Sequence, residues 1–493
     1  MVDIILGKSD AGAVVLDLSR VNRHGLIAGA TGTGKTVSLQ AMAEQLAAAG
    51  CNVFVSDVKG DLAGLSMAGD GPDWATARYK EMGLTYAPKA ANVVLWDVAA
   101  NNKKNPAGHP VRVTVSEMGP LLLGTLLELS DVQAGVLQIV FQVADDEGLL
   151  LLDMKDLRRL LTYVHEHVKE LGAKYGLIST ASIGAIQRGL LSFEREGGAD
   201  LFGEPALQVA DLLARGSDGK GVVHVLHAVE LMQQPRVYAM FLLYLLSELF
   251  EQLPEVGDLP MPKLCFFFDE AHLLFDNAPK PLLDKVTQVV RLIRSKGVGV
   301  YFVTQQPSDV PEDVLGQLGN RVQHALRAAT PQGQKDIKVA ATTMASNPAF
   351  DTAKELPNLG VGWALVSVLD KKGIPQPVQK VAMLPPVSRV GPITDMERKQ
   401  VVGQSMLRGR YDQVVDRASA FEMLEQRVSQ GGDMQTTVTK TTVKEERSAV
   451  SEFMWGTNRR QGVVQTAAKT VVRQVAGQIG RELLRGFLGG LKR

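Results

Sequence analysis

Apolar residues recur along this chain in two patterns, and each pattern predicts a different kind of element. Short unbroken apolar runs are typical of strands buried on both faces of a parallel sheet, and they lie at residues 24–28, 51–57, 92–98, 221–227, 263–270 and 299–307. From residue 116 to about residue 196, leucines and valines recur at helical spacing instead. The chain is therefore expected to form an α/β fold with a mostly parallel central sheet and an all-helical insertion.

The same patterns divide the chain into successive parts. Residues 1–22 predict a hairpin, residues 109–115 predict a strand that returns toward the sheet, and residues 362–368 and 378–384 predict closing strands of the sheet. The core is expected in two halves, residues 1–115 and 221–388, with the helical insertion between them at residues 116–220. A helical extension (389–430), a flexible linker (431–465) and a basic amphipathic helix (466–493) are expected to follow. The last helix is expected to dock on this or a neighbouring subunit, with nucleic acid or a membrane surface as the alternative.

A loop of the form G-x-x-x-x-G-K-[ST] follows the strand at residues 24–28 and precedes a helix predicted at Val37–Ala49. Glycines let the backbone curl so that N–H groups converge on phosphate oxygens, and the positive end of the helix points there too. Lys35 is expected to contact the β- and γ-phosphates, and the Thr36 hydroxyl to hold Mg²⁺. The flanking strand and helix disfavour a chance match. The residues predicted to bind ATP are Gly29, Ala30, Thr31, Gly32, Thr33, Gly34, Lys35, Thr36 and Val37.

Two acids, Asp269 and Glu270, end the most apolar of the predicted strands. In a parallel sheet the carboxyl ends of the strands share one edge, so these acids are expected to face the phosphate loop. Asp269 is expected to hold Mg²⁺ through its water shell, and Glu270 to polarise the attacking water. A purely structural role is disfavoured, because buried acids without a compensating cation are costly.

Polar groups also end two other strands. Gln305 is expected to sense the γ-phosphate or to orient water, since an amide both donates and accepts hydrogen bonds; capping of a turn is the alternative. Asp57 and Lys59 are expected to lie near the nucleotide, with a cap or turn as the alternative for Asp57.

An arginine from a neighbouring subunit would stabilise the charge that develops on the transferring phosphoryl group. Four arginines are candidates, and the pattern does not choose among them: Arg291 and Arg294 on the helix before residues 299–307, and Arg321 and Arg327 on the strand predicted next. A surface position without a role in the site is the alternative for each.

Composition adds limits to this picture. Lys+Arg and Asp+Glu both number 53 in the 493 residues, so the net charge gives no argument for nucleic acid and any basic surface must be local. The two cysteines, Cys51 and Cys265, give no disulfide framework. No signal-peptide pattern is present, and the longest apolar runs are too short to cross a bilayer. A cytoplasmic protein without membrane insertion is expected.

In combination, the motifs at residues 24–36, 57–61, 266–272, 303–307 and 320–321 resemble the HerA/FtsK class of RecA-like P-loop ATPases, and more narrowly the HerA-like YjgR family. The resemblance implies a RecA-like fold, ATP bound between neighbours in a homo-hexameric ring, and double-stranded DNA moved through the channel. The spacing of the two site arginines in that class is similar to that of Arg23 and Arg294. Arg294 is therefore the first candidate for the arginine acting in trans, and Arg327 the second.

The chain also departs from relatives of this class. HerA carries an N-terminal β-barrel that docks a nuclease, and no corresponding segment is present, so a nuclease partner is not expected. The tetrapeptide at residues 269–272 also spells the second motif of DEAH-box helicases, but their Gln-x-x-Gly-Arg-x-x-Arg element is missing. The expected function is an ATP-hydrolysing ring motor acting on double-stranded DNA. The alternative is a nucleotide-gated assembly or scaffold ATPase that acts on protein partners.

Overall fold

The computed structural model describes residues 3–98, 106–276, 280–327, 330–431, 456–457 and 460–461. The chain divides into two units, Met1–Arg427 and Val428–Arg493. In the second unit, strands β13 (Gly456–Thr457) and β14 (Arg460–Gln461) pair antiparallel. Apart from Gly431, the rest of the predicted linker and all of the predicted terminal helix lie outside the described residues.

A twelve-stranded mixed sheet forms the centre of the first unit, in the order β2-β1-β12-β11-β10-β3-β9-β8-β4-β7-β5-β6. All neighbours from β10 to β6 pair parallel, whereas β2, β1, β12 and β11 pair antiparallel. The strands are β1 (Ile4–Ser9), β2 (Gly12–Leu16), β3 (Gly25–Ala28), β4 (Asn52–Asp57), β5 (Val93–Asp97), β6 (His109–Pro110), β7 (Val223–His227), β8 (Leu264–Phe268), β9 (Val298–Thr304), β10 (Asn320–His324), β11 (Trp363–Ser367) and β12 (Gln379–Met383).

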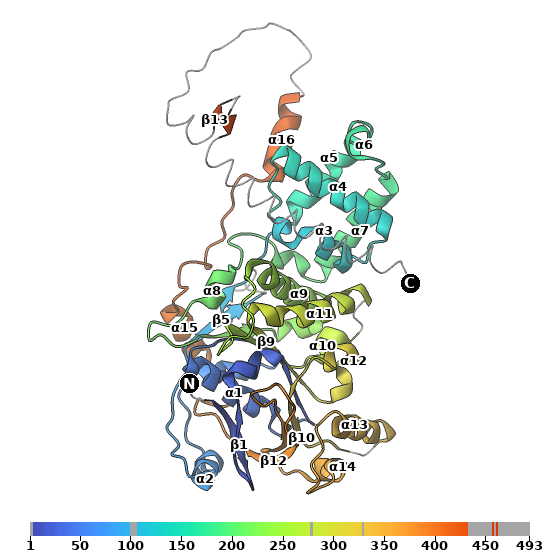
Figure 1. Ribbon diagram of the computed structural model, residues 1–493. Coiled ribbons are helices and arrows are strands. Elements are labelled where there is room, and N and C mark those ends of the chain that lie inside the picture. The colour runs from blue at the N-terminus through green and yellow to red at the C-terminus, as the bar shows by residue number, and fades with distance from the viewer. Residues whose placement is uncertain are drawn as a thin grey trace. The chain divides into compact units, whose positions relative to one another are not determined.

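Helices cover both faces of this sheet (Figure 1). α1 packs with β1, β4 and β7 in one apolar cluster, and α9 and α11 belong to the cluster on the other face. The helices are α1 (Lys35–Ala49), α2 (Asp73–Glu81), α3 (Val115–Leu126), α4 (Asp131–Glu147), α5 (Met154–Glu166), α6 (Val168–Tyr175), α7 (Thr180–Arg195), α8 (Val209–Leu213), α9 (Pro235–Gln252), α10 (His272–Phe275), α11 (Lys280–Ile293), α12 (Glu312–Leu315), α13 (Pro331–Thr342), α14 (Thr352–Glu355), α15 (Asp395–Gln404) and α16 (Ala420–Gly431).

The predicted all-helical insertion is confirmed, since α3 to α8 follow one another between β6 and β7. Its apolar core is continuous with that of one sheet face, because Leu137 and Val140 of α4 belong to the same cluster as Phe266 of β8. The insertion and the sheet therefore share one buried interior.

The strand predicted at residues 109–115 is wrong in its length, because only His109 and Pro110 pair with β5. Proline lacks the N–H that would continue a ladder. Four residues later, Thr114 and Glu117 form a capping box, with Thr114 Oγ1 accepting from the Glu117 N–H at 3.1 Å, and this cap starts α3.

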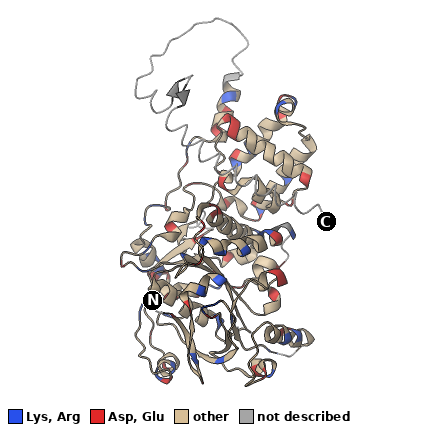
Figure 2. Ribbon diagram, viewed as in Figure 1, with Lys and Arg blue, Asp and Glu red and all other residues tan. Residues whose placement is uncertain are grey.

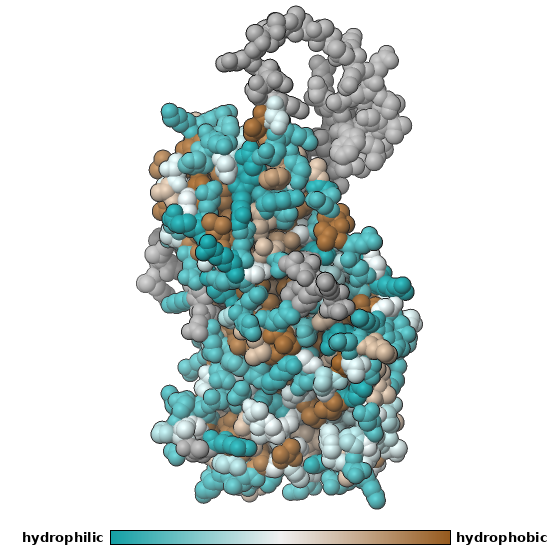
Figure 3. Space-filling view, turned by 180° about the vertical axis from the view of Figure 1, so that it is seen from behind, coloured by the Kyte–Doolittle hydropathy of each residue, from teal (hydrophilic) through white to brown (hydrophobic). Residues whose placement is uncertain are grey.

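Charges of both signs are interspersed over the described elements, without a face of one sign in this view (Figure 2). From behind, the described surface is mostly hydrophilic, with apolar side chains in scattered groups (Figure 3). Among the helices that the structure describes, not one combines the length and the apolar character needed to span a bilayer.

His24 ties the start of β3 to two neighbouring elements. It lies between the 3₁₀ helix η1 (Leu18–Arg23) and β3, with a positive φ of 58°. Nε2 lies 2.8 Å from the Val290 carbonyl oxygen on α11, and Nδ1 accepts from the Val300 N–H on β9 at 3.0 Å. Burial lowers the pKa of His24 to about 4. The neutral imidazole, donating from Nε2 and accepting at Nδ1, satisfies both partners.

Stability is expected to fall as the pH drops from about 6.5, the ordinary pKa of histidine, toward the lowered pKa of His24. The unfolded chain takes up a proton in this range and the folded chain does not, so protonation favours unfolding by up to about 3 kcal/mol for this residue. Urea unfolding across this pH range measures the effect. His24→Gln keeps one donor and one acceptor without titrating, so its stability should depend less on pH; equal slopes for both proteins would contradict the prediction.

Candidate nucleotide-binding site

The phosphate loop joins β3 to α1 and is held in place by neighbouring strands. The Gly29 N–H donates to the Thr304 carbonyl oxygen at 3.3 Å, and the Ala30 N–H to that of Ala325 at 2.8 Å. Gly34 ends the loop with φ 111°, a conformation that side chains rarely adopt. Because α1 begins at Lys35, the amides of its first turn have no partner within the helix and are free to bind an anion.

Lys35 lies inside this loop, and its side chain is buried. Nζ donates to the carbonyl oxygens of Gly29 at 2.6 Å and Ala30 at 3.2 Å. Burial lowers the pKa of Lys35, while the nearby charge of Glu270 opposes that shift. Thr36 and Val37 follow in the first turn of α1 and are half-buried. The loop and the acids predicted to work with it are thus close enough to interact.

Asp269 and Glu270 follow β8, which lies two strands from β3 at the same carboxyl edge. Asp269 is fully buried, and neither of its carboxylate oxygens has a hydrogen-bond partner. Burial raises the pKa of Asp269 to about 7. A buried carboxylate with two unmatched oxygens favours a cation, and oxygen ligands suit Mg²⁺. Asp269 therefore fits the Mg²⁺ that accompanies a nucleotide, and Thr36, in the first turn of α1, adds a hydroxyl at the same edge of the sheet.

Glu270 is held by three side chains. Its carboxylate pairs with the Lys59 ammonium, lies 3.2 Å from His272 Nδ1, and accepts from Gln305 Nε2 at 3.5 Å, the limit for a hydrogen bond. Glu270 adopts φ 48°, an uncommon conformation for a residue with a side chain. Burial tends to raise the pKa of Glu270, but Lys59, His272 and Gln305 together outweigh burial and lower it. The carboxylate is kept ionised.

The predictions for Asp57 and Lys59 have different outcomes. The Asp57 carboxylate accepts from the N–H groups of Gly60 at 2.7 Å, Asp61 at 3.2 Å and Leu62 at 3.0 Å. Asp57 thus shapes the turn after β4, which was the alternative for this residue. Lys59 lies on that turn and reaches the site through Glu270. Gln305 lies at the end of β9, exposed and within reach of Glu270.

Two of the candidate arginines lie at the opposite edge of the sheet. Arg23 ends η1, with His24 between it and β3, and Arg294 opens the 3₁₀ helix η6 (Arg294–Lys296), which Gly297 joins to β9. Both reach Asp258, at 3.0 Å from Arg23 Nη2 and 3.9 Å from Arg294 Nη2, and Arg20 joins them at 3.7 Å. These guanidiniums share one carboxylate that is itself half exposed, and they lie at the far ends of the strands that carry the phosphate loop and Gln305.

Arg327 lies elsewhere. It is exposed and follows β10, at the carboxyl edge next to the phosphate loop of its own chain. This place favours a role within its own subunit over action on a neighbouring one. Arg321 lies on β10 itself and donates to the Leu315 carbonyl oxygen at 2.9 Å.

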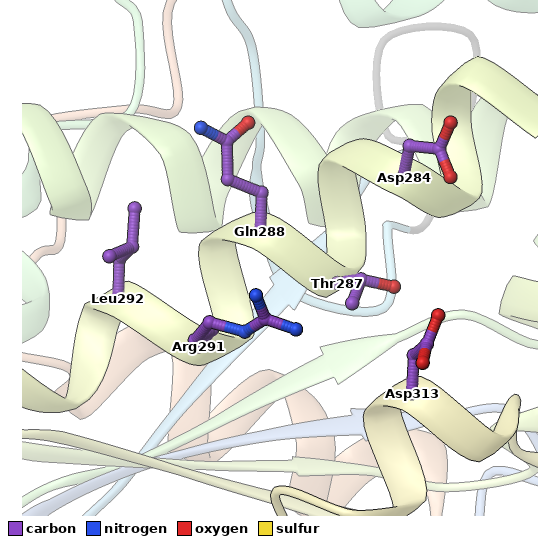
Figure 4. Close-up of a pocket in the computed structure, with 6 residues that line it drawn as sticks. All are labelled: Asp284, Thr287, Gln288, Arg291, Leu292 and Asp313. Atoms are coloured by element: carbon purple, nitrogen blue, oxygen red, sulfur yellow. The ribbon is translucent and has the colours of Figure 1, made fainter. Parts of the chain in front are cut away.

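A separate hollow of about 280 Å³ lies beside α11 and α12 (Figure 4). Its walls include two other acids, Asp284 and Asp313, and the exposed Arg291. The phosphate loop, Asp269 and Glu270 do not line it. Its lining residues are Asp284, Thr287, Gln288, Arg291, Leu292 and Asp313.

Two features of this site escaped the sequence analysis. Arg20 has a weak signal, because it lies three residues before Arg23 in the same 3₁₀ helix. Asp258, which all three arginines reach, has none, because it lies in the loop between α9 and β8, where no motif marks it.

A family model described as Helicase HerA-like C-terminal matches residues 4–493. No match was found among curated proteins.

Solved structures supply the comparison of folds. The unbound monoclinic form of the bacterial conjugative coupling protein TrwBdeltaN70 is 13% identical with a TM-score of 0.53, over 79% of this chain and 90% of that chain. TrwB in complex with a non-hydrolysable GTP analogue is 14% identical with a TM-score of 0.50, over 79% and 93%. VirB4 of Thermoanaerobacter pseudethanolicus is 16% identical with a TM-score of 0.47, over 77% and 96%. With the sheet order, the first likeness confirms the predicted RecA-like P-loop fold.

Proposed function

Because this chain belongs to the Helicase HerA-like C-terminal family, we propose that it is an ATP-hydrolysing motor that forms a homo-hexameric ring and translocates or remodels double-stranded DNA in the cytoplasm. The proposal assigns ATP to the phosphate loop, and Mg²⁺ to Asp269 and Thr36. Bound Mg²⁺ would neutralise charge on the phosphates. Solved structures of TrwB, a fold relative, hold an ATP analogue, a GTP analogue, and ADP with Mg²⁺.

One observation carries the proposal, namely the division of the charged groups between two edges of one sheet. The phosphate loop, Asp269 and Glu270 lie at the carboxyl edge, whereas Arg23 and Arg294 lie at the amino edge. A subunit with this division presents its arginines away from its own site. If the arginine edge of one subunit contacts the phosphate-loop edge of the next, the contact is head-to-tail. Such contacts generate a closed ring when the rotation between neighbouring subunits closes. This supports a site completed by the next subunit.

The residues then take distinct roles. Lys35 and the first amides of α1 bind and orient the phosphates. Glu270 accepts a proton from the attacking water, and Gln305 orients that water. Arg294, with Arg23, stabilises the negative charge that develops on the phosphoryl group in the site of the neighbouring subunit.

Double-stranded DNA is expected to raise the rate of ATP hydrolysis severalfold at low salt, where phosphate contacts are strongest. Phosphate release measured with and without duplex DNA, and electron microscopy of particles with ATP and DNA, test motor and ring. Lys35→Ala is the control. If the preparation is free of other ATPases, this variant should release no phosphate, with or without DNA. If DNA changes neither turnover nor oligomeric state while ATP is still hydrolysed, the assembly ATPase acting on protein partners is the correct function.

A further inference from the structure

The outer wall of the phosphate loop is made by the first residues of β11. The Gly362 N–H donates to the Thr33 carbonyl oxygen at 3.1 Å. The carbonyl oxygen of Trp363 lies 3.1 Å from His324 Nδ1, and Nε2 of the same imidazole lies 3.0 Å from Ser38 Oγ on α1. The backbone that carries Trp363 is thus fixed both to the phosphate loop and to the helix that follows it.

An arginine lies over this tryptophan without a full set of partners. The Arg78 guanidinium, from α2, lies 5.3 Å from the centre of the half-buried Trp363 indole. Among the residues that the structure describes, its Nη1 is buried without a hydrogen-bond partner, and its one ion pair runs from Nε to Glu81 at 3.6 Å. By contrast Lys380, 6.0 Å from the same ring, is paired with Glu355 at 2.9 Å. Arg78 therefore keeps an unmatched donor beside the loop.

The order of the strands gives a nucleotide its direction. From β3, the acids lie two strands away on β8, whereas Gly362 and Trp363 lie two strands away on the other side, on β11. A γ-phosphate that faces Glu270 places the α-phosphate and the nucleoside on the side away from the acids. That side carries Trp363 and Arg78.

We infer that Trp363 and Arg78 form the base-binding part of the nucleotide site, and that they select purine nucleoside triphosphates. Every base offers a π-face to an aromatic side chain, so Trp363 contributes affinity for all bases. A guanidinium donates to ring acceptors such as N7, which adenine and guanine have and pyrimidines lack. Arg78 thus contributes the preference for purines. The inference rests on the proposed binding of ATP at the phosphate loop.

Equilibrium binding of ATP, CTP and inorganic tripolyphosphate to the full chain tests this assignment. Trp363→Ala is expected to weaken ATP binding roughly tenfold and to leave tripolyphosphate binding unchanged. Trp363→Phe keeps an aromatic face and should retain most of the affinity. Arg78→Ala should lower the ratio of ATP to CTP affinity. The matched control is Trp74→Ala, because Trp74 also lies on α2 but is 50% exposed and lines a different hollow.

Two results would overturn the assignment. One is ATP binding unchanged in Trp363→Ala, and the other is an equal loss of ATP and tripolyphosphate binding, since the change would then act through the loop. An unaltered ATP to CTP ratio in Arg78→Ala would overturn the purine preference. Lys35→Ala separates this test from the proposed function: it should weaken both ATP and tripolyphosphate, and wild-type protein that binds neither would refute nucleotide binding itself.

Discussion

Glu270→Gln is expected to lower the rate of ATP hydrolysis by at least about 100-fold, the usual contribution of a general base. The amide preserves the shape of the side chain but cannot take a proton from water. Glu270 is buried, lies beside Lys59 and interacts with Lys35 through space. The neighbouring Asp269 differs, because both of its carboxylate oxygens lack hydrogen-bond partners and suit a cation.

Phosphate release at saturating ATP measures this effect, and retained ATP binding shows that the fold and the loop are intact. Glu312→Gln is the matched control, since Glu312 is exposed on α12 and should be neutral. Turnover near the wild-type rate in Glu270→Gln would remove this residue from the role of base.

Arg294→Ala is expected to lower the rate of ATP hydrolysis roughly a thousandfold, the lower end of the usual effect of an arginine that acts in trans. ATP binding should persist. The reason is its location. Arg294 lies at the amino edge of the sheet, away from the phosphate loop of its own chain, and its side chain is 42% exposed. It shares Asp258 with Arg23, so its guanidinium is only partly neutralised where it lies.

Mixing two inactive variants tests whether this arginine acts on a neighbour. A site formed by Glu270 of an Arg294→Ala subunit and Arg294 of a Glu270→Gln subunit is complete, so the mixture should regain turnover that neither variant has alone. Arg291→Ala is the control, because Arg291 lies three residues away on α11, facing the hollow of Figure 4. Mixed assemblies that form but stay inactive would contradict action in trans, and Arg327→Ala would then be tested next.

The chemistry of the site was readable where it depends on local sequence. The phosphate loop needs its glycines, Lys35 and Thr36 in a fixed order, and the apolar run before Asp269 marks a buried strand. Parallel strands share a carboxyl edge, so both motifs were expected at the same place, and the structure brings them together there. The α/β class and the helical insertion follow from apolar spacing in the same way.

Contacts between distant segments were not predictable. Lys59 and Glu270 are far apart along the chain, and their pairing depends on β4 and β8 being neighbours, an order that no local pattern specifies. The same holds for Arg78 and Trp363, since α2 has only a short, polar sequence and was not predicted as a helix. Residues 109–115 were predicted as one strand because valines and a threonine favour strands. The proline at 110 and the capping box at Thr114, which end the strand and start α3, were given too little weight.

The pairing of Lys59 with Glu270 has a consequence for how a ligand enters. Lys35 and Lys59 lie beside Asp269 and Glu270, so the positive and negative side chains of the site nearly balance. Little surplus positive charge remains to attract a triphosphate that carries no cation. A triphosphate arriving alone would add uncompensated repulsion against Asp269 and Glu270, whereas one that arrives with its divalent counter-ion would not. Cation and anion are therefore expected to enter as one species.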